Sequence, residues 1–196
     1  MLISSDMSWS PHIDSVRAKA QQRLGFIRRN LRGSPQECKR LAYLALVRSG
    51  LEYASVIWDP HLQVDIDKLE KVQRKGARWV TSTYARRASV TELLETLKWD
   101  SLQERRRQQR LIFLFKILND DVAVPAQSVD LVLNIRPTRG DQNLRKLKEP
   151  ACRSTLLEES FVHKTLNEWN LLPQSVVSAD SVSTFKSRLA KSSASQ

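Results

Sequence analysis

The stretch VDIDKLEKVQRKGARWVT, residues 64 to 81, has the clearest periodicity in the chain. On a helix that turns by about 100° per residue, its apolar residues fall on one side and its cations on the other. The apolar side carries Leu69, Val72, Gly76, Trp79 and Val80, and the opposite side carries Lys68, Lys71, Arg74, Lys75 and Arg78. The stretch therefore predicts an amphipathic helix with one buried face and one basic face.

Two further helices are predicted before this stretch. Pro11 and Gly33 are typical of a helix start and a helix end, which predicts a helix over residues 11–32. Ser34-Pro35-Gln36-Glu37 matches a capping box and predicts a second helix. This helix is expected to continue or kink through Gly50 toward Trp58, and Asp59-Pro60 ends it.

Helices are also predicted after the stretch. Capping boxes at Ser89 with Glu92 and at Ser101 with Glu104 predict a short helix and then a longer one reaching about residue 119. Two later helices are predicted over residues 160–171, stopped by Pro173, and over residues 181–191. Segments 122–125 and 131–135 are expected to be extended.

Composition agrees with a helical fold. The chain has 196 residues, of which 41% are hydrophobic, so it is long enough to bury a core. Five glycines and seven prolines are few, which favours long helices over a sandwich with many tight turns. The fold class is therefore expected to be all-α or mainly α, a helical bundle followed by a helical and irregular C-terminal region, with a boundary near residues 120–130.

Positive charge is the main compositional indication of function. The chain holds 32 basic and 21 acidic residues, a net charge of +11. Residues 1–120 hold 22 basic and 13 acidic residues, and residues 121–196 hold 10 and 8, so most of the excess lies in the first part. Such an excess favours a polyanionic partner, and nucleic acid is the first candidate. A solvated helix face is the alternative explanation of the same charges.

Other arginines and the tryptophans have more ordinary explanations. Arg17, Arg28 and Arg32 lie along one flank of the first predicted helix and are secondary candidates for phosphate contact. The run of arginines at 105–107 cannot form one patch, because consecutive helical residues point in different directions, so ion pairs within the fold are expected. Most of the five tryptophans, Trp79 among them, are expected in the core instead of on base-stacking surfaces.

Several chemistries find no support in the sequence. Asp120-Asp121 is the only adjacent aspartate pair and is interpreted as a helix exit instead of a two-magnesium site. The three histidines and two cysteines show no zinc spacing, and no glycine-rich phosphate loop occurs. No catalytic residue, metal or cofactor is therefore expected. No apolar run reaches the roughly 20 residues of a membrane span, and an intracellular location, nuclear or cytoplasmic, is expected.

Five short motifs in fixed order give the chain a resemblance to a known family. They are Leu51-Glu52-Tyr53-Ala54-Ser55, Trp58-Asp59-Pro60, Leu69-Glu70-Lys71-Val72-Gln73-Arg74, Phe161-Val162-His163-Lys164-Thr165-Leu166 and Trp169-Asn170-Leu171-Leu172-Pro173. Together they resemble the C-terminal portion of jockey-like non-LTR (LINE-type) retrotransposon reverse transcriptases, which are RNA-directed DNA polymerases. Ile3-Ser4-Ser5-Asp6-Met7-Ser8-Trp9 resembles the end of the strand pair that closes the palm in this family.

The resemblance implies that the chain is a fragment of such an enzyme. Residues 1–10 would be the end of the palm and residues 11–82 a thumb-like helical bundle. Residues 83–120 would be its helical continuation, and residues 121–196 a C-terminal region with short extended segments and two helices. Since the catalytic aspartates of the family would lie upstream of Met1, no polymerase activity is expected of the chain itself.

The expected function is binding of an RNA or DNA template–primer duplex through its backbone, without reading sequence. The absent palm and fingers are further expected partners, while a membrane and a small-molecule substrate are not. The candidate residues are Lys68, Lys71, Arg74, Lys75, Arg78, Arg17, Arg28 and Arg32. Two alternatives stay open, a module that docks onto a protein through apolar helix faces and a mobile-element remnant without function. Phosphate binding weakens steeply with salt, whereas apolar docking need not.

Overall fold

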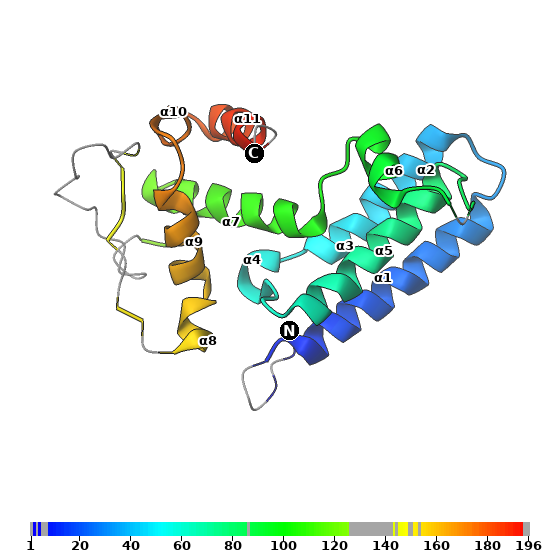
Figure 1. The fold of residues 1–196 in the computed structure, drawn as a ribbon, viewed down its shortest axis with the longest axis horizontal. Coiled ribbons are helices and arrows are strands. Elements are labelled where there is room, and N and C mark those ends of the chain that lie inside the picture. Colours follow the sequence, from blue (N-terminus) through cyan, green and yellow to red (C-terminus); the bar gives the residue numbers. More distant parts are fainter. Residues whose placement is uncertain are drawn as a thin grey trace. The chain divides into compact units, whose positions relative to one another are not determined.

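The computed structural model describes residues 2, 4, 8–85, 87–125, 143, 145–148, 151–152 and 154–193. These residues are mainly α-helical, which confirms the predicted fold class (Figure 1). The chain divides into two compact units, Met1–Arg106 and Arg107–Gln196. This division lies inside a helix, whose apolar second half packs with later segments, whereas the sequence patterns predict a boundary near residues 120–130.

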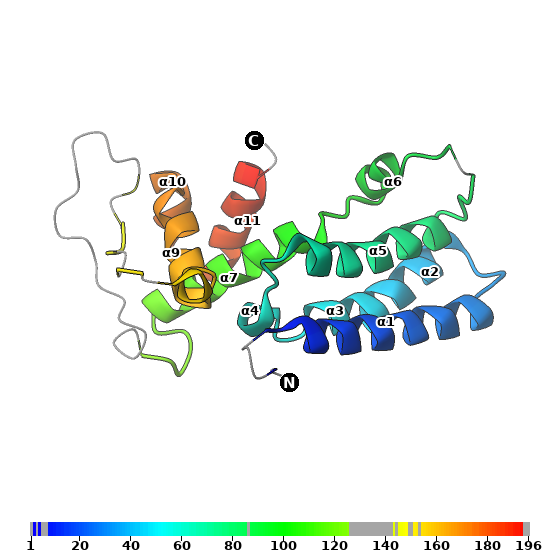
Figure 2. The ribbon, with the colours of Figure 1, turned by 60° about the horizontal axis from the view of Figure 1, so that its bottom comes forward.

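The first unit is built on three long helical segments. Helix α1 (Ser10–Asn30) and helix α5 (Gln63–Val80) run in the same direction. Between them the chain returns through α2 (Gln36–Tyr43), the π-helical turn η1 (Leu44–Arg48) and α3 (Ser49–Glu52) (Figure 2). α1 contacts α5, η1 and α3, and α2 also contacts α5.

Short helices complete this unit. Tyr53 and Ala54 interrupt the helix after α3, and Ala54 has a left-handed φ of 52°. Helix α4 (Ser55–Trp58) follows. Helix α6 (Val90–Leu97) packs on α5, and the start of α7 (Leu102–Leu118) also belongs to this unit. The buried core joins all of these segments. Its largest members are Ile13, Leu24, Ile27, Tyr43, Leu51, Trp58, Leu69, Trp79, Trp99 and Leu102.

Most helix boundaries agree with the capping signals. The hydroxyls of Ser89 and Ser101 accept the backbone N–H groups of Glu92 and Glu104, as capping boxes predict. The box at Ser34 was wrong. Pro35 is the residue before α2 and has an extended ψ of 154°, so the helix begins one residue later than the box requires.

The second unit continues from α7. It contains α8 (Thr155–Glu158), α9 (Phe161–Asn170), α10 (Gln174–Val177) and α11 (Val182–Ser193). Its core gathers apolar residues from α7, α9, α10 and α11 around Phe115, Trp169 and Phe185. The one-turn helices α8 and α10 were not predicted, because four residues are too few to show a helical period.

The structure describes only part of the predicted extended segments and of the predicted end of the palm. Residues 122–124 form bends after the tight turn that ends α7, instead of the predicted extended segment 122–125. The predicted segment 131–135 lies outside the described residues, as do several residues of the segment 1–10 and most of the basic stretch 136–153.

Candidate nucleic-acid interface

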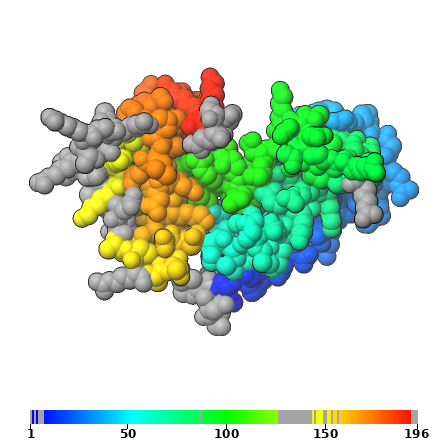
Figure 3. Space-filling view, viewed as in Figure 1, coloured from blue at the N-terminus to red at the C-terminus, as the bar shows by residue number. Residues whose placement is uncertain are grey.

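Close packing of α5 against the core determines which of its faces meets solvent. Leu69 and Val72 are fully buried, and Trp79 is 3% exposed. At Gly76 an added Cβ would lie 2.3 Å from Cε2 of Tyr43, so α5 passes directly over that ring. The side of α5 opposite these residues faces outward, between α6 and α1 in the space-filling view (Figure 3).

Three of the five predicted basic residues are exposed on this outer side. Lys71, Arg74 and Lys75 are all exposed and follow one another at helical spacing. Among the described residues, no carboxylate forms an ion pair with any of them. We call these three residues the α5 basic face. Three cations within about one helical turn repel one another unless an anion lies nearby.

The other two residues of the predicted face have partners within the unit. The Nζ of Lys68 lies 2.8 Å from Asp65 and 3.2 Å from Asp14. The hydrogen bond to Asp65 raises the pKa of Lys68. Arg78 donates to the carbonyl oxygens of Ala85 and Ala88, at 3.3 and 3.4 Å, and so holds the loop after α5.

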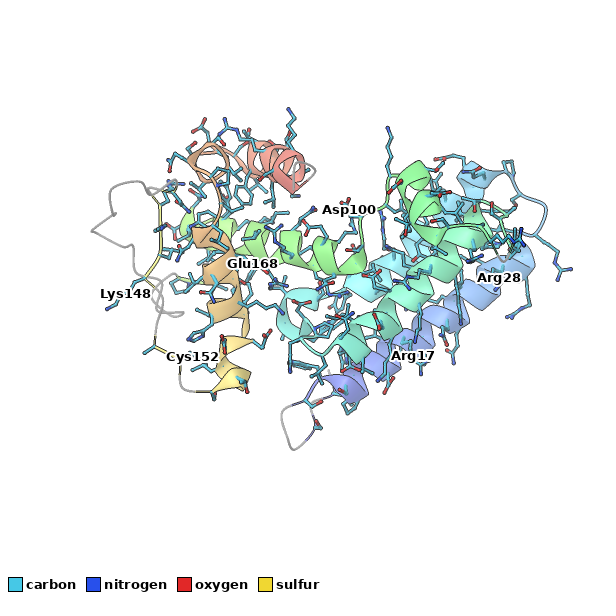
Figure 4. The ribbon with its side chains drawn as sticks, viewed as in Figure 1. Arg17, Arg28, Asp100, Lys148, Cys152 and Glu168 are labelled. Atoms are coloured by element: carbon cyan, nitrogen blue, oxygen red, sulfur yellow. The ribbon has the colours of Figure 1, made fainter. Side chains whose placement is uncertain are left out.

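The three secondary candidates for phosphate contact, on or just after α1, do not form one surface. Arg17 forms an i, i+3 ion pair with Asp14 at 3.5 Å. Arg28 lies about three turns further along, near the C-terminal end of α1 (Figure 4). Arg28 and Arg32, which follows the end of α1, are both exposed. There they line a cavity of about 410 Å³ together with Lys39 from α2. The predicted set therefore forms two basic surfaces, not one.

Glu70 is the acidic residue nearest in sequence to the α5 basic face, and it has a structural role. Its carboxylate accepts the backbone N–H of Gln103 at 2.9 Å, which caps the start of α7. Burial raises the pKa of Glu70, while the charges of Arg106 and Arg74 act in the opposite direction. Glu70 is 7% exposed, so it adds little negative charge to the solvent-facing side of α5.

The arginines near the start of α7 bind acids, as expected, but the partners come from distant segments. Arg105 binds the carboxylate of Glu52, and Arg106 lies 2.8 Å from Asp59. Within the second unit, Arg110 of α7 lies 2.6 Å from Glu168 of α9. These ion pairs connect residues more than 40 positions apart, and sequence spacing could not identify them.

The tryptophans are structural, which confirms the prediction for most of them. Trp58 and Trp169 are fully buried, Trp79 is 3% exposed and Trp99 is 6% exposed. The exposed aromatic side chains are instead two tyrosines and a phenylalanine. Tyr53 is 79% exposed, and Phe26 and Tyr84 are each 58% exposed. None of the three was a predicted base-stacking residue.

Asp120 and Asp121 lie at the end of α7, as interpreted. Asp120 has a left-handed φ of 55°. Its N–H bonds to the carbonyl of Ile117, and the N–H of Asp121 bonds to that of Lys116 at 2.9 Å. This pair of bonds is the Schellman ending of a helix. Among the described residues, no three His, Cys, Asp or Glu side chains converge in a way that could hold a metal ion.

Comparisons with protein-family models, with curated proteins and with solved structures found no match. None of the helices in the described part of the chain is long and apolar enough to cross a membrane. The geometry of the first unit, above all the α5 basic face, is therefore what a functional assignment can rest on.

Proposed function

We propose that the chain binds the phosphate backbone of a nucleic-acid duplex without reading its sequence, through the α5 basic face. The observation that carries the proposal is the exposure of Lys71, Arg74 and Lys75 with no ion-paired acid among the described residues. Elsewhere in the same unit, Lys68, Arg40 and Arg105 all have carboxylate partners. Cations left without partners on a rigid helix are typical of a surface for anions.

Charge and rigidity both support this assignment. Residues 1–106 hold 19 basic and 12 acidic residues, so the unit that carries the face is strongly positive. The face is on an 18-residue helix whose opposite side is buried, which keeps the three cations in fixed register. Neutralising phosphates there releases condensed counterions, and this favours binding independently of base sequence.

The resemblance to retrotransposon reverse transcriptases supplies the biological setting of the proposal. In that setting the first unit is the helical thumb, and its ligand is the template–primer duplex. The chain alone is proposed to lack polymerase activity. We expect no template-dependent incorporation by the purified chain with Mg²⁺. Incorporation that disappears in Asp120→Ala, Asp121→Ala protein would contradict this proposal.

The test of binding is its salt dependence. In Lys71→Ala, Arg74→Ala, Lys75→Ala protein, the slope of log affinity against log salt should shrink by roughly 0.9 for each phosphate of duplex DNA that the protein no longer neutralises. Alanine is a good helix former, so the melting temperature should stay close to that of the parent. Affinity for a primer–template hybrid would be measured at several salt concentrations with unrelated sequences.

A matched variant controls for net charge. Lys19→Ala, Lys98→Asn, Lys186→Ala removes three exposed cations from other surfaces. Asparagine is chosen at residue 98 because Lys98 has a left-handed φ of 54°. If both triple variants change the slope equally, only total charge matters and the α5 basic face is not the binding site.

A second candidate function rests on a different surface of the first unit. Residues of α1 and the η1 region line an open groove of about 570 Å³, and two large apolar side chains in it are exposed. Phe26 is 58% exposed and Leu46 is 48% exposed. This groove favours the alternative of docking onto a protein. Two results together would favour docking over phosphate binding. The salt slope of hybrid binding would be unchanged in the α5 triple variant, and binding of the hybrid would be abolished in Phe26→Ser, Leu46→Ser protein.

A further inference from the structure

The cavity at the end of the first unit is a second basic surface with its own composition. It lies where α1 ends, α2 begins and α5 ends, and its volume is about 410 Å³. Its lining residues are Gly25, Arg28, Arg29, Arg32, Lys39, Trp79, Ser82 and Tyr84. Four of these eight residues are cations, two are aromatic and none is acidic.

Lys39 is the most informative residue of this cavity. It is only 8% exposed, and its Nζ donates to the hydroxyl of Ser82 at 3.0 Å. Among the described residues no carboxylate forms an ion pair with Lys39. A buried ammonium group is costly unless an anion or several hydrogen bonds compensate it. One neutral hydroxyl is a weak partner for such a charge, so an anion bound beside Lys39 would stabilise it.

Helix ends explain only part of this clustering. Cations near the C-termini of α1 and α5 are favourable, because each helix carries about half a negative charge at that end. Two such ends offset about one of the four positive charges. The remaining positive charge is complementary to a ligand with at least two negative charges, and phosphate groups fit this description.

The aromatic residues narrow the class of ligand. Trp79 forms part of the apolar lining and is almost fully buried, whereas Tyr84 is 58% exposed. Exposed aromatic rings beside cations bind nucleobases by stacking. A cavity of this volume also lies within the usual range for small ligands, about 300 to 1,000 Å³.

We infer that this cavity binds the phosphate groups of a nucleotide, held by Arg28, Arg32 and Lys39, with its base against Tyr84. The site is separate from the α5 basic face and goes beyond the backbone binding proposed for it. The nucleotide is either free or the phosphorylated 5′ end of a strand, since both present the same chemistry.

The test uses the whole chain, with ATP and inorganic pyrophosphate as probes in isothermal titration. ATP should bind more tightly than pyrophosphate, because only ATP carries a base. Arg28→Gln, Arg32→Gln should weaken both probes by more than about tenfold, as expected when charge-assisted hydrogen bonds are removed. Tyr84→Ala should lower ATP affinity to the level of pyrophosphate and leave pyrophosphate unchanged.

Lys39→Met separates ligand binding from a structural role. Removing a buried charge without an ionic partner should leave the melting temperature of the free protein unchanged or higher, while binding of both probes is abolished. If Lys39→Met melts lower and still binds pyrophosphate, Lys39 serves the fold and the inference is wrong. Unchanged affinity for both probes in Arg28→Gln, Arg32→Gln would equally overturn it.

Two further measurements are needed. One distinguishes a free nucleotide from a strand end, and the other distinguishes the nucleotide site from the α5 basic face. A 5′-phosphorylated single strand that binds more tightly than both ATP and its unphosphorylated form indicates a strand end, and the reverse order indicates a free nucleotide. The triple variant of the α5 basic face should bind ATP as the parent does. In the parent protein, failure of duplex binding with ATP binding intact would refute the proposed function alone.

Discussion

The two units use their positive charges in different ways. In the second unit, Arg110 and Lys164 pair with carboxylates, at 2.6 and 3.0 Å. Arg145 and Arg188 donate to backbone carbonyl oxygens. In the first unit, cations such as Lys68 and Arg105 also have carboxylate partners, but the α5 basic face and the cavity at the end of α1 carry cations without ion-paired acids among the described residues. A cation that stabilises the fold is thus distinguished by its partner, not by its residue type.

The two cores rest on similar aromatic contacts. In the first unit the rings of Tyr43 and Trp99 stack at 4.7 Å between centroids. In the second unit Phe115 and Phe185 stack at 4.4 Å, and Trp169 lies 5.8 Å from Phe185. Each unit therefore has its own apolar core, and a substitution in one core should destabilise mainly that unit.

Removing one buried tryptophan from each unit has the largest expected effect. Trp169→Ala and Trp79→Ala should each lower the free energy of unfolding by about 3 to 5 kcal/mol. Trp169→Ala also removes the hydrogen bond from its indole Nε1 to the carbonyl of Arg145. Hydrogen exchange should then become faster mainly in the unit that carries the substitution. Faster exchange throughout both units in either variant would show that their stabilities are coupled.

Duplex binding gives the second measurement on the same variants. Trp169→Ala should bind duplex like the parent under conditions where the first unit stays folded, because the α5 basic face is on that unit. Trp79→Ala should stop binding only as the first unit unfolds. Parental stability without duplex binding in Trp79→Ala would instead identify Trp79 as a base-stacking residue.

Two glycines test how closely the first unit is packed. Gly76→Ala places a methyl group against the buried ring of Tyr43, at 2.3 Å before relaxation. Overpacking of about 1 to 3 kcal/mol should exceed the gain of about 1 kcal/mol in helix propensity. Denaturant unfolding should therefore show a net loss of stability.

Gly50→Ala is the matched control, because its nearest obstacle is the guanidinium of Arg23, at 2.4 Å. The exposed arginine side chain can move away at little cost, so this variant should be as stable as the parent or more stable. Equal destabilisation of both variants would mean that the close approach of α5 to Tyr43 is not what makes Gly76 necessary.

The smallest expected effect is a pH dependence in the first unit. Burial, together with the positive charge of Lys19, lowers the pKa of His12 below its ordinary value of 6.5. The unfolded chain therefore takes up this proton more readily than the folded chain. Stability from this group is full above about pH 6.5 and is lost as pH falls through that value toward the folded pKa.

Urea midpoints at about pH 5.5 and pH 7.5 measure this effect. His12 lies between the rings of Trp9 and Trp58, with centroids at 6.2 and 5.4 Å, so the control His12→Gln keeps a side chain at this position. The parent should lose more stability at the lower pH than His12→Gln does. An identical pH response in both proteins would exclude His12 as its source.

Three helix ends lack the glycine that would have allowed their backbone conformation to be predicted from local sequence. Helices α5, α6 and α7 all end with a left-handed residue, respectively Ser82, Lys98 and Asp120. Glycine is the usual signal for such an ending, and none is present at these positions. Tertiary packing imposes this backbone at Lys98, where the following Trp99 stacks on the buried ring of Tyr43.

Local sequence patterns were sufficient to predict the helical class, most helix starts and the division of α5 into an apolar and a basic side. Periodicity and capping depend on residues within a few positions of one another, so they can be observed in one dimension. Which cations form ion pairs, as Lys68 does with Asp14, and which remain exposed on the α5 basic face became visible only in the folded chain. The fold also brought Arg28, Lys39 and Tyr84 to one cavity. Electrostatic pairing depends on distance in space, and the fold alone sets that distance for residues far apart in the chain.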